Sequence, residues 1–239
     1  MSKSSRAPKN IKISHRGLWN NKNPENTIGA FKRSIQKYLP IELDVHLLKD
    51  DTLVVFHDDN LKRMTNIDLD LKNATYEEIR DIKIKNTVFT ISTFEEVLEY
   101  VNGRVLLDIE IKTDVKSFKI CKLVSKVLDN YNGSFMIKSF NPLYIIWFRI
   151  YKPEYIRGLL IDRLNKTNKI IKRIYRTIIF SKFFIRFLAK LDFIAYDSRD
   201  LPNKKLEKIH KKGLPIYLWT IRNQKLEYTF DGIIFEERK

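Results

Sequence analysis

The sequence predicts a single parallel α/β domain of the (β/α)8, or TIM, barrel class. The chain has 239 residues, a length at which one α/β barrel is common. Short runs rich in β-branched residues alternate with longer runs of helical periodicity, and eight such β-runs separated by helices indicate a parallel sheet. We therefore expect functional side chains at the carboxyl ends of the strands, where the βα loops of a barrel meet.

The predicted elements follow in a regular order. The β-runs are residues 11–15, 41–48, 104–112, 134–140, 155–161, 193–197, 214–220 and 231–235. The helical runs are residues 25–38, 92–101, 114–131, 141–151 and 201–212. The chain shows no internal repeat beyond this alternation and no linker, so we expect one domain over residues 11–239 after a flexible N-terminal tail over residues 1–10.

One part of the chain departs from the alternation. Residues 52–59, "TLVVFHDD", follow the polar turn "KDDT" and predict an additional extended piece in a hairpin-like arrangement. Residues 58–91 are irregular in pattern, apart from a helical run at residues 75–82. We expect them to form a small insertion within the second βα unit.

Composition excludes several classes of protein. Cys121 is the only cysteine, so no intrachain disulfide forms, which suits a reducing cytoplasm. No stretch reaches eighteen uninterrupted apolar residues, and the N-terminus lacks the apolar region of a signal peptide. The formal charge of +16 favours polyanions in general, and because no nucleic-acid motif accompanies it, we expect no nucleic-acid partner. The expected location is the cytoplasm.

Three carboxylates lie within β-runs. Glu42 and Asp44 are two residues apart, so on a strand both point to the same side. Like charges on an inner barrel face are costly unless a cation neutralises them. With Glu110 on another strand they would form an oxygen-rich site suited to Mg²⁺ or Ca²⁺. The structural alternative is that each is a solvated charge at a strand end.

Two of the four histidines close β-runs. His15 ends the first run and His57 ends the extended piece, and their ordinary pKa near neutrality suits a general base and a general acid. A lone histidine at a strand end is more often structural. We expect His46 to face the outer side of the barrel and His210 to be a cation at a helix end.

Other polar and aromatic side chains adjoin these positions. Arg16 and Lys112 are candidates to bind phosphate oxygens, although Lys112 would equally pair with a site carboxylate. Trp219 would wall the pocket or be buried in the core. Glu25 falls at the start of the first helix and would either support the metal side or complement the helix dipole, and Asn26 or Thr27 would cap that helix.

Taken together, these residues resemble the glycerophosphodiester phosphodiesterase family, of the phospholipase C-like phosphodiesterase type. The matching motifs, in the family's order, are "HRG" at 15–17, "PENT..AF" at 24–31, "ELD" at 42–44, "HD" at 57–58, "IEIK" at 109–112, "SFNP" at 139–142 and "WT" at 219–220. Two places depart from the family's usual pattern: "WTIRN" in place of "WTVN", and Phe235 and Glu236 where an aspartate and a proline are usual. Both departures bear on the alcohol moiety more than on the chemistry.

The resemblance implies a TIM barrel that hydrolyses glycerophosphodiesters to glycerol 3-phosphate and an alcohol. It implies a divalent metal, Mg²⁺ or Ca²⁺ with Mn²⁺ as a further candidate. The implied roles are metal binding by Glu42, Asp44 and Glu110, acid–base catalysis by His15 and His57, phosphate contact by Arg16 and Lys112, and substrate lining by Phe140 and Trp219. The nucleophile is left open between water and the glycerol 2-hydroxyl.

Residues 166–190 form a long run in which cations recur between isoleucine and phenylalanine clusters without an acidic residue. Such a run suits peripheral association with an anionic membrane, and equally an ordinary barrel helix with solvated lysines. Two other functions stay open: a related barrel phospholipase acting on lysophospholipids, and a catalytically inactive barrel that binds phosphorylated ligands or lipid. The sequence does not predict the oligomeric state.

Overall fold

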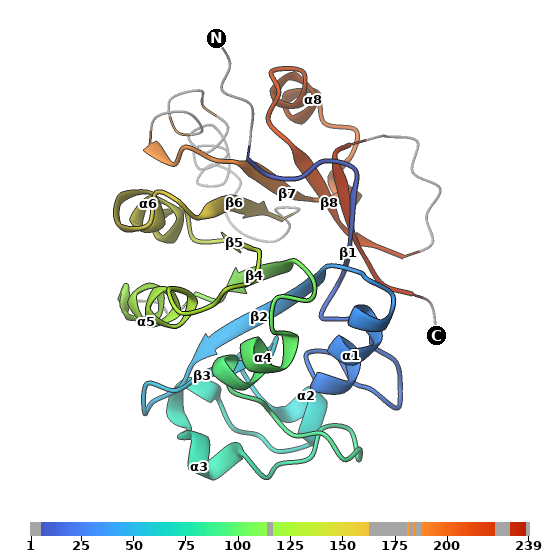
Figure 1. Ribbon diagram of the computed structural model, residues 1–239, viewed down its shortest axis with the longest axis vertical. Coiled ribbons are helices and arrows are strands. Elements are labelled where there is room, and N and C mark those ends of the chain that lie inside the picture. Colours follow the sequence, from blue (N-terminus) through green and yellow to red (C-terminus); the bar gives the residue numbers. More distant parts are fainter. Residues whose placement is uncertain are drawn as a thin grey trace.

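In the computed structural model, described over residues 6–113, 117–162, 181, 184, 188–222 and 230–237, a closed barrel of eight parallel strands is surrounded by helices (Figure 1). The strands are β1 (Ile11–Ser14), β2 (Ile41–Leu47), β3 (Leu53–Val55), β4 (Leu107–Ile111), β5 (Phe135–Ser139), β6 (Ile156–Ile161), β7 (Phe193–Asp197), β8 (Ile216–Ile221) and β9 (Gly232–Phe235). The predicted (β/α)8 barrel is confirmed.

Strand pairing closes the ring. The order β1-β9-β8-β7-β6-β5-β4-β2 is completed by a pairing of β1 with β2, in which Ser14 is opposite Ile41. Strand β3 lies outside the ring and runs antiparallel to β2, with Val55 opposite Val45. It is the extended piece expected at residues 52–59.

The helices begin where the sequence supplies caps. They are α1 (Ile28–Gln36), α2 (Lys62–Thr65), η1 (Leu71–Asn73), α3 (Tyr76–Ile79), α4 (Phe94–Val101), α5 (Lys119–Leu128), α6 (Pro142–Tyr151), η3 (Ser198–Asp200) and α8 (Lys204–His210). Thr27 caps α1 by accepting a hydrogen bond from the Ala30 N–H, so that helix starts three residues later than its pattern suggested. Thr93 and Glu96 form a capping box at α4.

Apolar side chains fill two layers. One cluster occupies the barrel interior and includes Ile13, Met136, Leu160, Phe193 and Tyr217. Two larger clusters lie between the strands and the surrounding helices. The interior is therefore a packed core, and we expect its chemistry at the carboxyl ends of the strands.

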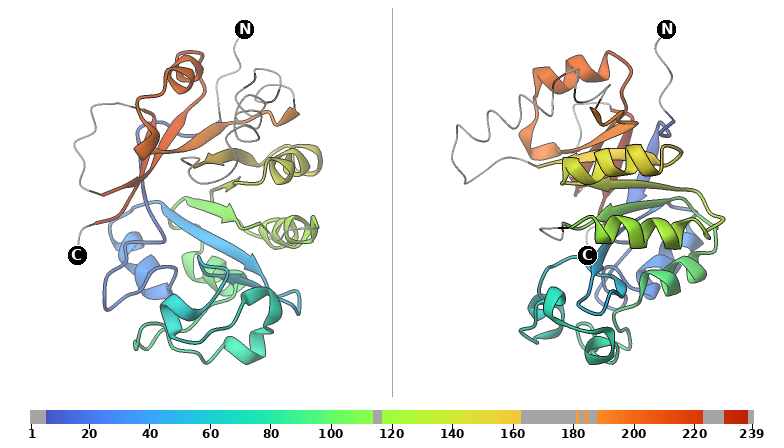
Figure 2. Two further views of the ribbon diagram at one scale, coloured as in Figure 1. Left: turned by 180° about the vertical axis from the view of Figure 1, so that it is seen from behind. Right: turned by 90° about the vertical axis from the view of Figure 1, so that its left-hand side faces the viewer.

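The insertion at residues 58–91 has a small core of its own. Leu61, Met64, Leu71 and Ile79 pack with Phe56 behind β3. Its helices α2, η1 and α3 are single turns, gathered near α1 at one end of the long axis of the molecule (teal in Figures 1 and 2). This arrangement places Arg63 and Asp58 beside the mouth of the barrel, where both contact site residues.

Residues 6–10 of the expected tail pack against the opposite, amino-terminal end of the barrel. Arg6 forms an ion pair with Asp192 at 2.9 Å and donates to the carbonyl of Tyr155, and the Tyr217 hydroxyl donates to the Pro8 carbonyl at 2.5 Å. The basic and apolar run at residues 166–190, for which peripheral membrane association and an ordinary barrel helix were both open, lies outside the described residues except for 181, 184 and 188–190. Among the described helices, none has the length and apolarity needed to cross a bilayer.

Candidate active site

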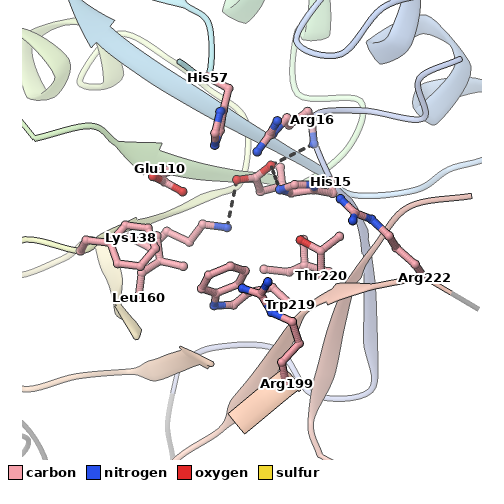
Figure 3. A pocket seen from close by; sticks show the side chains of 13 residues that line it. His15, Arg16, His57, Glu110, Lys138, Leu160, Arg199, Trp219, Thr220 and Arg222 are labelled. Atoms are coloured by element: carbon pink, nitrogen blue, oxygen red, sulfur yellow. Dashed lines mark hydrogen bonds and ion pairs between the residues drawn. The ribbon is translucent and has the colours of Figure 1, made fainter. Parts of the chain in front are cut away.

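Each of the eight barrel strands, or the segment directly after it, contributes to one pocket of about 290 Å³ at the carboxyl ends of the strands (Figure 3). Seven of the predicted site residues line it: His15, Arg16, Glu42, His57, Glu110, Phe140 and Trp219. Asp44, Lys112 and Glu25 lie behind this lining and contact its members. The structure thus brings together every residue that the sequence marked as a candidate for the site.

The three carboxylates meet because their strands are neighbours. On β2 and β4 the register sets Asp44 beside Glu110, and Glu42 shares their face of the sheet. One ligand oxygen from each of the three lies within 4.8 Å of the others, and all three side chains are buried. Three hard oxygen donors in this arrangement fit a Mg²⁺ or Ca²⁺ ion.

Two cations neutralise Asp44. The Lys112 ammonium lies 2.8 Å from Asp44 and 2.7 Å from Glu110, and the Arg16 guanidinium lies 3.5 Å from Asp44. Burial alone would favour the protonated acid, but the charges of Lys112 and Arg16 outweigh it and hold the pKa of Asp44 well below its usual value. Asp44 is therefore an anion at neutral pH, as metal binding requires.

A second buried ion pair lies deeper in the barrel. The Lys138 ammonium is fully buried, 2.6 Å from Asp108 and 3.3 Å from Glu42. Burial raises the pKa of Asp108 to about 6 even though the charge of Lys138 lowers it. Lys138 thus fixes one oxygen of Glu42 from below while lining the floor of the pocket (Figure 3).

Replacing Lys138 with methionine should destabilise the protein by about 3–5 kcal/mol, because two buried carboxylates lose their counter-ion. Chemical unfolding in urea measures the change. Lys126→Met, at an exposed position of α5, is the matched control and should change the free energy of unfolding by no more than about 0.5 kcal/mol. Adding Asp108→Asn to Lys138→Met should recover part of the loss, and a double variant as unstable as the sum of its parts would contradict the pairing.

His15 is held in place by a residue from the far end of the described chain. Its Nδ1 lies 2.6 Å from Oε1 of Glu236, which follows β9. Burial disfavours the carboxylate, but hydrogen bonds and charge from His15 and Arg222 outweigh this and lower the pKa of Glu236 to about 2. Because an ionised carboxylate only accepts, Nδ1 of His15 carries the hydrogen. The opposite nitrogen, Nε2, is left on the side of Glu42, 3.9 Å from its Oε2.

His57 is held in the same way. Its Nδ1 donates to Oδ1 of Asp58 at 2.5 Å, and Asp58 in turn accepts from Arg63. Arg63 also forms an ion pair with Glu25, which pairs with Arg16. Glu25 lies outside the first turn of α1, so its interpretation as a helix-dipole residue is wrong, and its place is beneath Arg16. In both imidazoles Nδ1 makes the short contact to a carboxylate. Nε2 makes no contact of that length with a carboxylate among the described residues.

Replacing Glu236 with glutamine should flatten the acid dependence of stability. The folded pKa of Glu236, about 2, is below its ordinary value of 4.5, so its stabilising effect is complete above pH 4.5 and is lost as the pH falls toward 2. The wild-type free energy of unfolding should fall more steeply than that of Glu236→Gln across this window. Urea unfolding at several pH values measures both slopes. Equal slopes would show that this carboxylate is not held ionised by the fold.

The turn after β1 sets the direction of Arg16. Arg16 and Gly17 have φ of 55° and 76°, in the left-handed region, and a Cβ at Gly17 would lie 2.9 Å from Ala30 and Phe31 on α1. The Arg16 backbone N–H donates to Glu42 at 2.9 Å, and its carbonyl accepts from the N–H of Asn26. Backbone and side chain of this turn are thus both tied to the carboxylate cluster.

Aromatic and basic side chains form the other side of the pocket. The rings of Phe140 and Trp219 meet edge to face with centroids 5.8 Å apart. The pairing register of β8 with β9 shifts between Leu218 and Ile221, and Trp219 lies within this interval. Such irregularities at the rim of a barrel change the direction of a side chain. Trp219, Thr220 and Arg199 lie across the pocket from His57 and Arg16 (Figure 3).

The sequence missed several of the contributors and placed another residue wrongly. Among those not predicted as site residues are Lys138, Glu236, Arg199, Arg222 and Asp58. The sequence did contain a signal for Lys138. It lies two residues before Phe140 in a mostly apolar strand, so the two side chains point to the same face of the sheet. The expectation that His46 faces outward is wrong: it has the parity of Glu42 and Asp44, is buried, and donates Nε2–H to the His57 carbonyl at 3.1 Å.

A parallel eight-stranded barrel whose mouth combines carboxylates, imidazoles and cations has the fold and the charged pocket of a TIM-barrel enzyme. The chain belongs to the glycerophosphoryl diester phosphodiesterase family, whose model matches residues 15–237.

Curated relatives support this membership. The glycerophosphodiester phosphodiesterase of Caldanaerobacter subterraneus subsp. tengcongensis is 37% identical over 147 residues, which are 56% of this chain and 59% of the relative. YhdW of Bacillus subtilis is 30% identical over 224 residues, covering 89% of this chain and 86% of the relative. Lysophospholipase D GDPD1 of Homo sapiens is 30% identical over 154 residues, covering 59% of this chain and 48% of the relative. The match to the first and third thus spans less than two thirds of their length.

Solved structures show the same fold. The glycerophosphodiester phosphodiesterase of Thermotoga maritima is 26% identical with a TM-score of 0.69, covering 94% of this chain and 93% of that one. A phosphodiesterase of Oleispira antarctica, solved with its product sn-glycerol-3-phosphate, is 20% identical with a TM-score of 0.75, covering 95% and 93%.

Proposed function

We propose that this chain hydrolyses glycerophosphodiesters to glycerol 3-phosphate and an alcohol. The observation that carries the proposal is that two imidazoles, each held at Nδ1 by a carboxylate, line the same pocket as Glu42, Glu110 and Arg16. Acid and base groups, anion-binding groups and metal-binding oxygens are the parts that metal-assisted phosphodiester cleavage needs. Family membership supports the same activity.

His15 and His57 would share the proton transfers. With Nδ1 protonated and bonded to Glu236 or Asp58, the Nε2 of each ring accepts a proton when neutral and donates one when charged. One ring would take the proton of the attacking hydroxyl, and the other would return a proton to the leaving alkoxide. The attacking group is water or the glycerol 2-hydroxyl. A cyclic phosphate detected in a rapid-quench time course would identify the second.

Glu42, Asp44 and Glu110 would hold one divalent cation, with Mg²⁺, Ca²⁺ and Mn²⁺ as candidates. Such an ion, when bound, stabilises negative charge that develops on phosphoryl oxygens. The residues around it are already arranged for an anion: Arg16 is anchored by Glu25 at 2.6 Å, and Lys112 bridges Asp44 and Glu110. Both cations would contact the phosphate from these positions.

Phe140 and Trp219 would face the alcohol part of the substrate. Their edge-to-face pair lines the pocket, and the Trp219 indole N–H is buried without an acceptor among the described residues. An oxygen of the alcohol would satisfy this donor. Arg199 and Arg222 line the pocket nearby, each paired with a carboxylate.

A side-by-side substrate panel tests the proposal. Glycerophosphocholine, glycerophosphoglycerol and a lysophospholipid are incubated with the protein in Mg²⁺, Ca²⁺ or Mn²⁺, and glycerol 3-phosphate is measured with a coupled enzyme. We expect release from the first two. No glycerol 3-phosphate from the first two substrates and no lysophosphatidic acid from the lysophospholipid, with any of the three ions, would reject the hydrolase and leave an inactive phosphate-binding or lipid-binding barrel.

The lysophospholipid substrate in this panel tests a second candidate function. Leu143 and Phe140 are exposed beside the pocket, where an acyl chain would leave it, and one relative carries the name lysophospholipase D. That enzyme class would release lysophosphatidic acid and the head-group alcohol. Detection of this lipid product at a higher kcat/KM than for glycerophosphocholine would favour it.

A further inference from the structure

The outer surface of helix α6 is apolar where a barrel helix normally meets water. Leu143, Ile150 and Tyr151 are 57%, 62% and 62% exposed, and Ile146 between them is half-buried. The inward side of α6 is apolar too, because Ile145 and Phe148 are fully buried. Apart from Arg149, whose guanidinium donates to the Leu188 carbonyl, α6 is thus apolar on its outer and inner sides, and such a helix is expected to be covered by something other than solvent.

The neighbouring helix supplies a row of cations. Lys119, Lys122 and Lys126 are exposed on α5 at helical spacing. Helices α5 and α6 lie side by side on the outside of the barrel, as both views of Figure 2 and Figure 1 show. Lys119 pairs with Asp51, whereas Lys122 and Lys126 make no ion pair within the described part of the chain.

Between the two helices runs an apolar groove with one basic edge. Its walls include Phe118, Lys122, Leu143, Trp147, Ile150 and Tyr151. Helix α6 has no acidic residue along its length, so no carboxylate of that helix opposes the lysines of α5. The face formed by α5 and α6 therefore joins exposed apolar and aromatic side chains to unpaired positive charge.

We propose that this α5–α6 face docks on an anionic lipid bilayer. The exposed apolar side chains of α6 would enter the boundary between head groups and acyl chains, and the lysines of α5 would lie against the anionic head groups. Tyr151, which is 62% exposed, has the amphipathic ring that favours this boundary. The docking does not depend on the proposed hydrolase activity, since none of these residues belongs to the catalytic pocket.

Charge favours a bilayer over a second copy of the chain. In a two-fold symmetric dimer the same patch lies on both partners, so the lysine rows of both copies would be brought into one interface. Like charges brought together in this way oppose association. An anionic bilayer complements the lysines and covers the apolar side chains at once.

The α5–α6 face begins close to the mouth of the pocket. Phe140 lines the pocket, and α6 begins two residues later with Leu143 exposed at its first turn. The amino-terminal ends of α5 and α6 lie at the same end of the barrel as the pocket, because each helix follows the carboxyl end of a strand. Docking would hold the pocket mouth at the edge of the lipid surface.

Vesicle flotation tests the proposal with the full chain. Vesicles of phosphatidylcholine alone are compared with mixed phosphatidylcholine–phosphatidylglycerol vesicles. We expect binding to the mixed vesicles only. Lys122→Glu/Lys126→Glu should weaken it about fivefold or more for each lysine lost. Leu143→Ser/Ile150→Ser should weaken it about tenfold for each side chain removed from the lipid.

Matched controls separate a defined face from diffuse charge. Lys204→Glu/Lys208→Glu makes the same charge change at the same spacing on α8, and Tyr38→Ser/Val88→Ser removes exposed apolar side chains elsewhere; both should bind as wild type does. Circular dichroism and thermal unfolding confirm that each variant is folded. Three results would overturn the proposal: no binding to either vesicle, equal losses in the controls, or a dimer in light scattering that Leu143→Ser/Ile150→Ser dissociates.

Discussion

Replacing His15 or His57 with alanine should lower kcat on a glycerophosphodiester by about 10²–10⁴-fold for either residue. Each ring is held at Nδ1 by a carboxylate, so its loss removes a placed proton donor or acceptor and leaves the pocket lining otherwise in place. The coupled glycerol 3-phosphate assay measures kcat and KM separately. Because proton transfer acts in the transition state, kcat should fall with little change in KM.

His210→Ala is the control for this pair. His210 lies at the end of α8 and pairs with Asp231 at 2.8 Å, outside the pocket. Its loss should leave kcat within about twofold of wild type, as for a surface change away from the chemistry. The double variant His15→Ala/His57→Ala should be little worse than the poorer single variant, because residues that act as a unit are not additive. Near-wild-type turnover by either single variant would remove that residue from the mechanism.

Chelation with EDTA should abolish activity, and Glu110→Gln should weaken the response to metal. Glu42, Asp44 and Glu110 bring one oxygen each within 4.8 Å, and metal bound only by the folded state raises its stability. Thermal unfolding with and without added Mg²⁺, Ca²⁺ or Mn²⁺ measures binding independently of turnover. A metal at about 100 times its Kd should stabilise the wild type by about 2.7 kcal/mol.

Asp129→Asn is the matched control for the metal experiment. Asp129 is an exposed carboxylate that pairs with Lys152 on the outside of the barrel, so its loss should not alter the metal-dependent rise in Tm. Glu110→Gln should reduce that rise. If no added ion raises the Tm of the wild type or restores activity after EDTA, the carboxylate cluster is not a metal site.

The barrel was predictable because its strands are short runs rich in apolar and β-branched residues that alternate with helical runs. Thr93 and Glu96 illustrate how a local capping pattern marks a helix start that the structure keeps. The insertion at residues 58–91 was not resolved in this way. Its helices α2, η1 and α3 are single turns stabilised by packing around Met64 and Phe56, and one turn is too short to show a period.

Some residues of the site could likewise be predicted from the sequence and others could not. Glu42 and Asp44 could be paired from their spacing alone, because a strand has a period of two residues. Glu236 could not, since its contact with His15 arises only when the first and last strands of the barrel pair. Lys138 was missed because a charge in a strand suggests a solvated end, whereas here the strand is interior and the charge is compensated by Asp108.

The pairing of β1 with β9 also determines when this pocket can exist during folding. Strand β1 has four register partners on β9 and a single one on β2, and the hydrogen bond from His15 to Glu236 spans 221 positions of sequence. Contacts of such separation form late, after the cost of closing a long loop has been met. On the ribosome, helices and neighbouring βα units can assemble as the chain emerges. His15 cannot form its hydrogen bond to Glu236 until residue 236 has left the ribosome. The hydrogen bond that holds His15 is thus among the last contacts of the barrel to form.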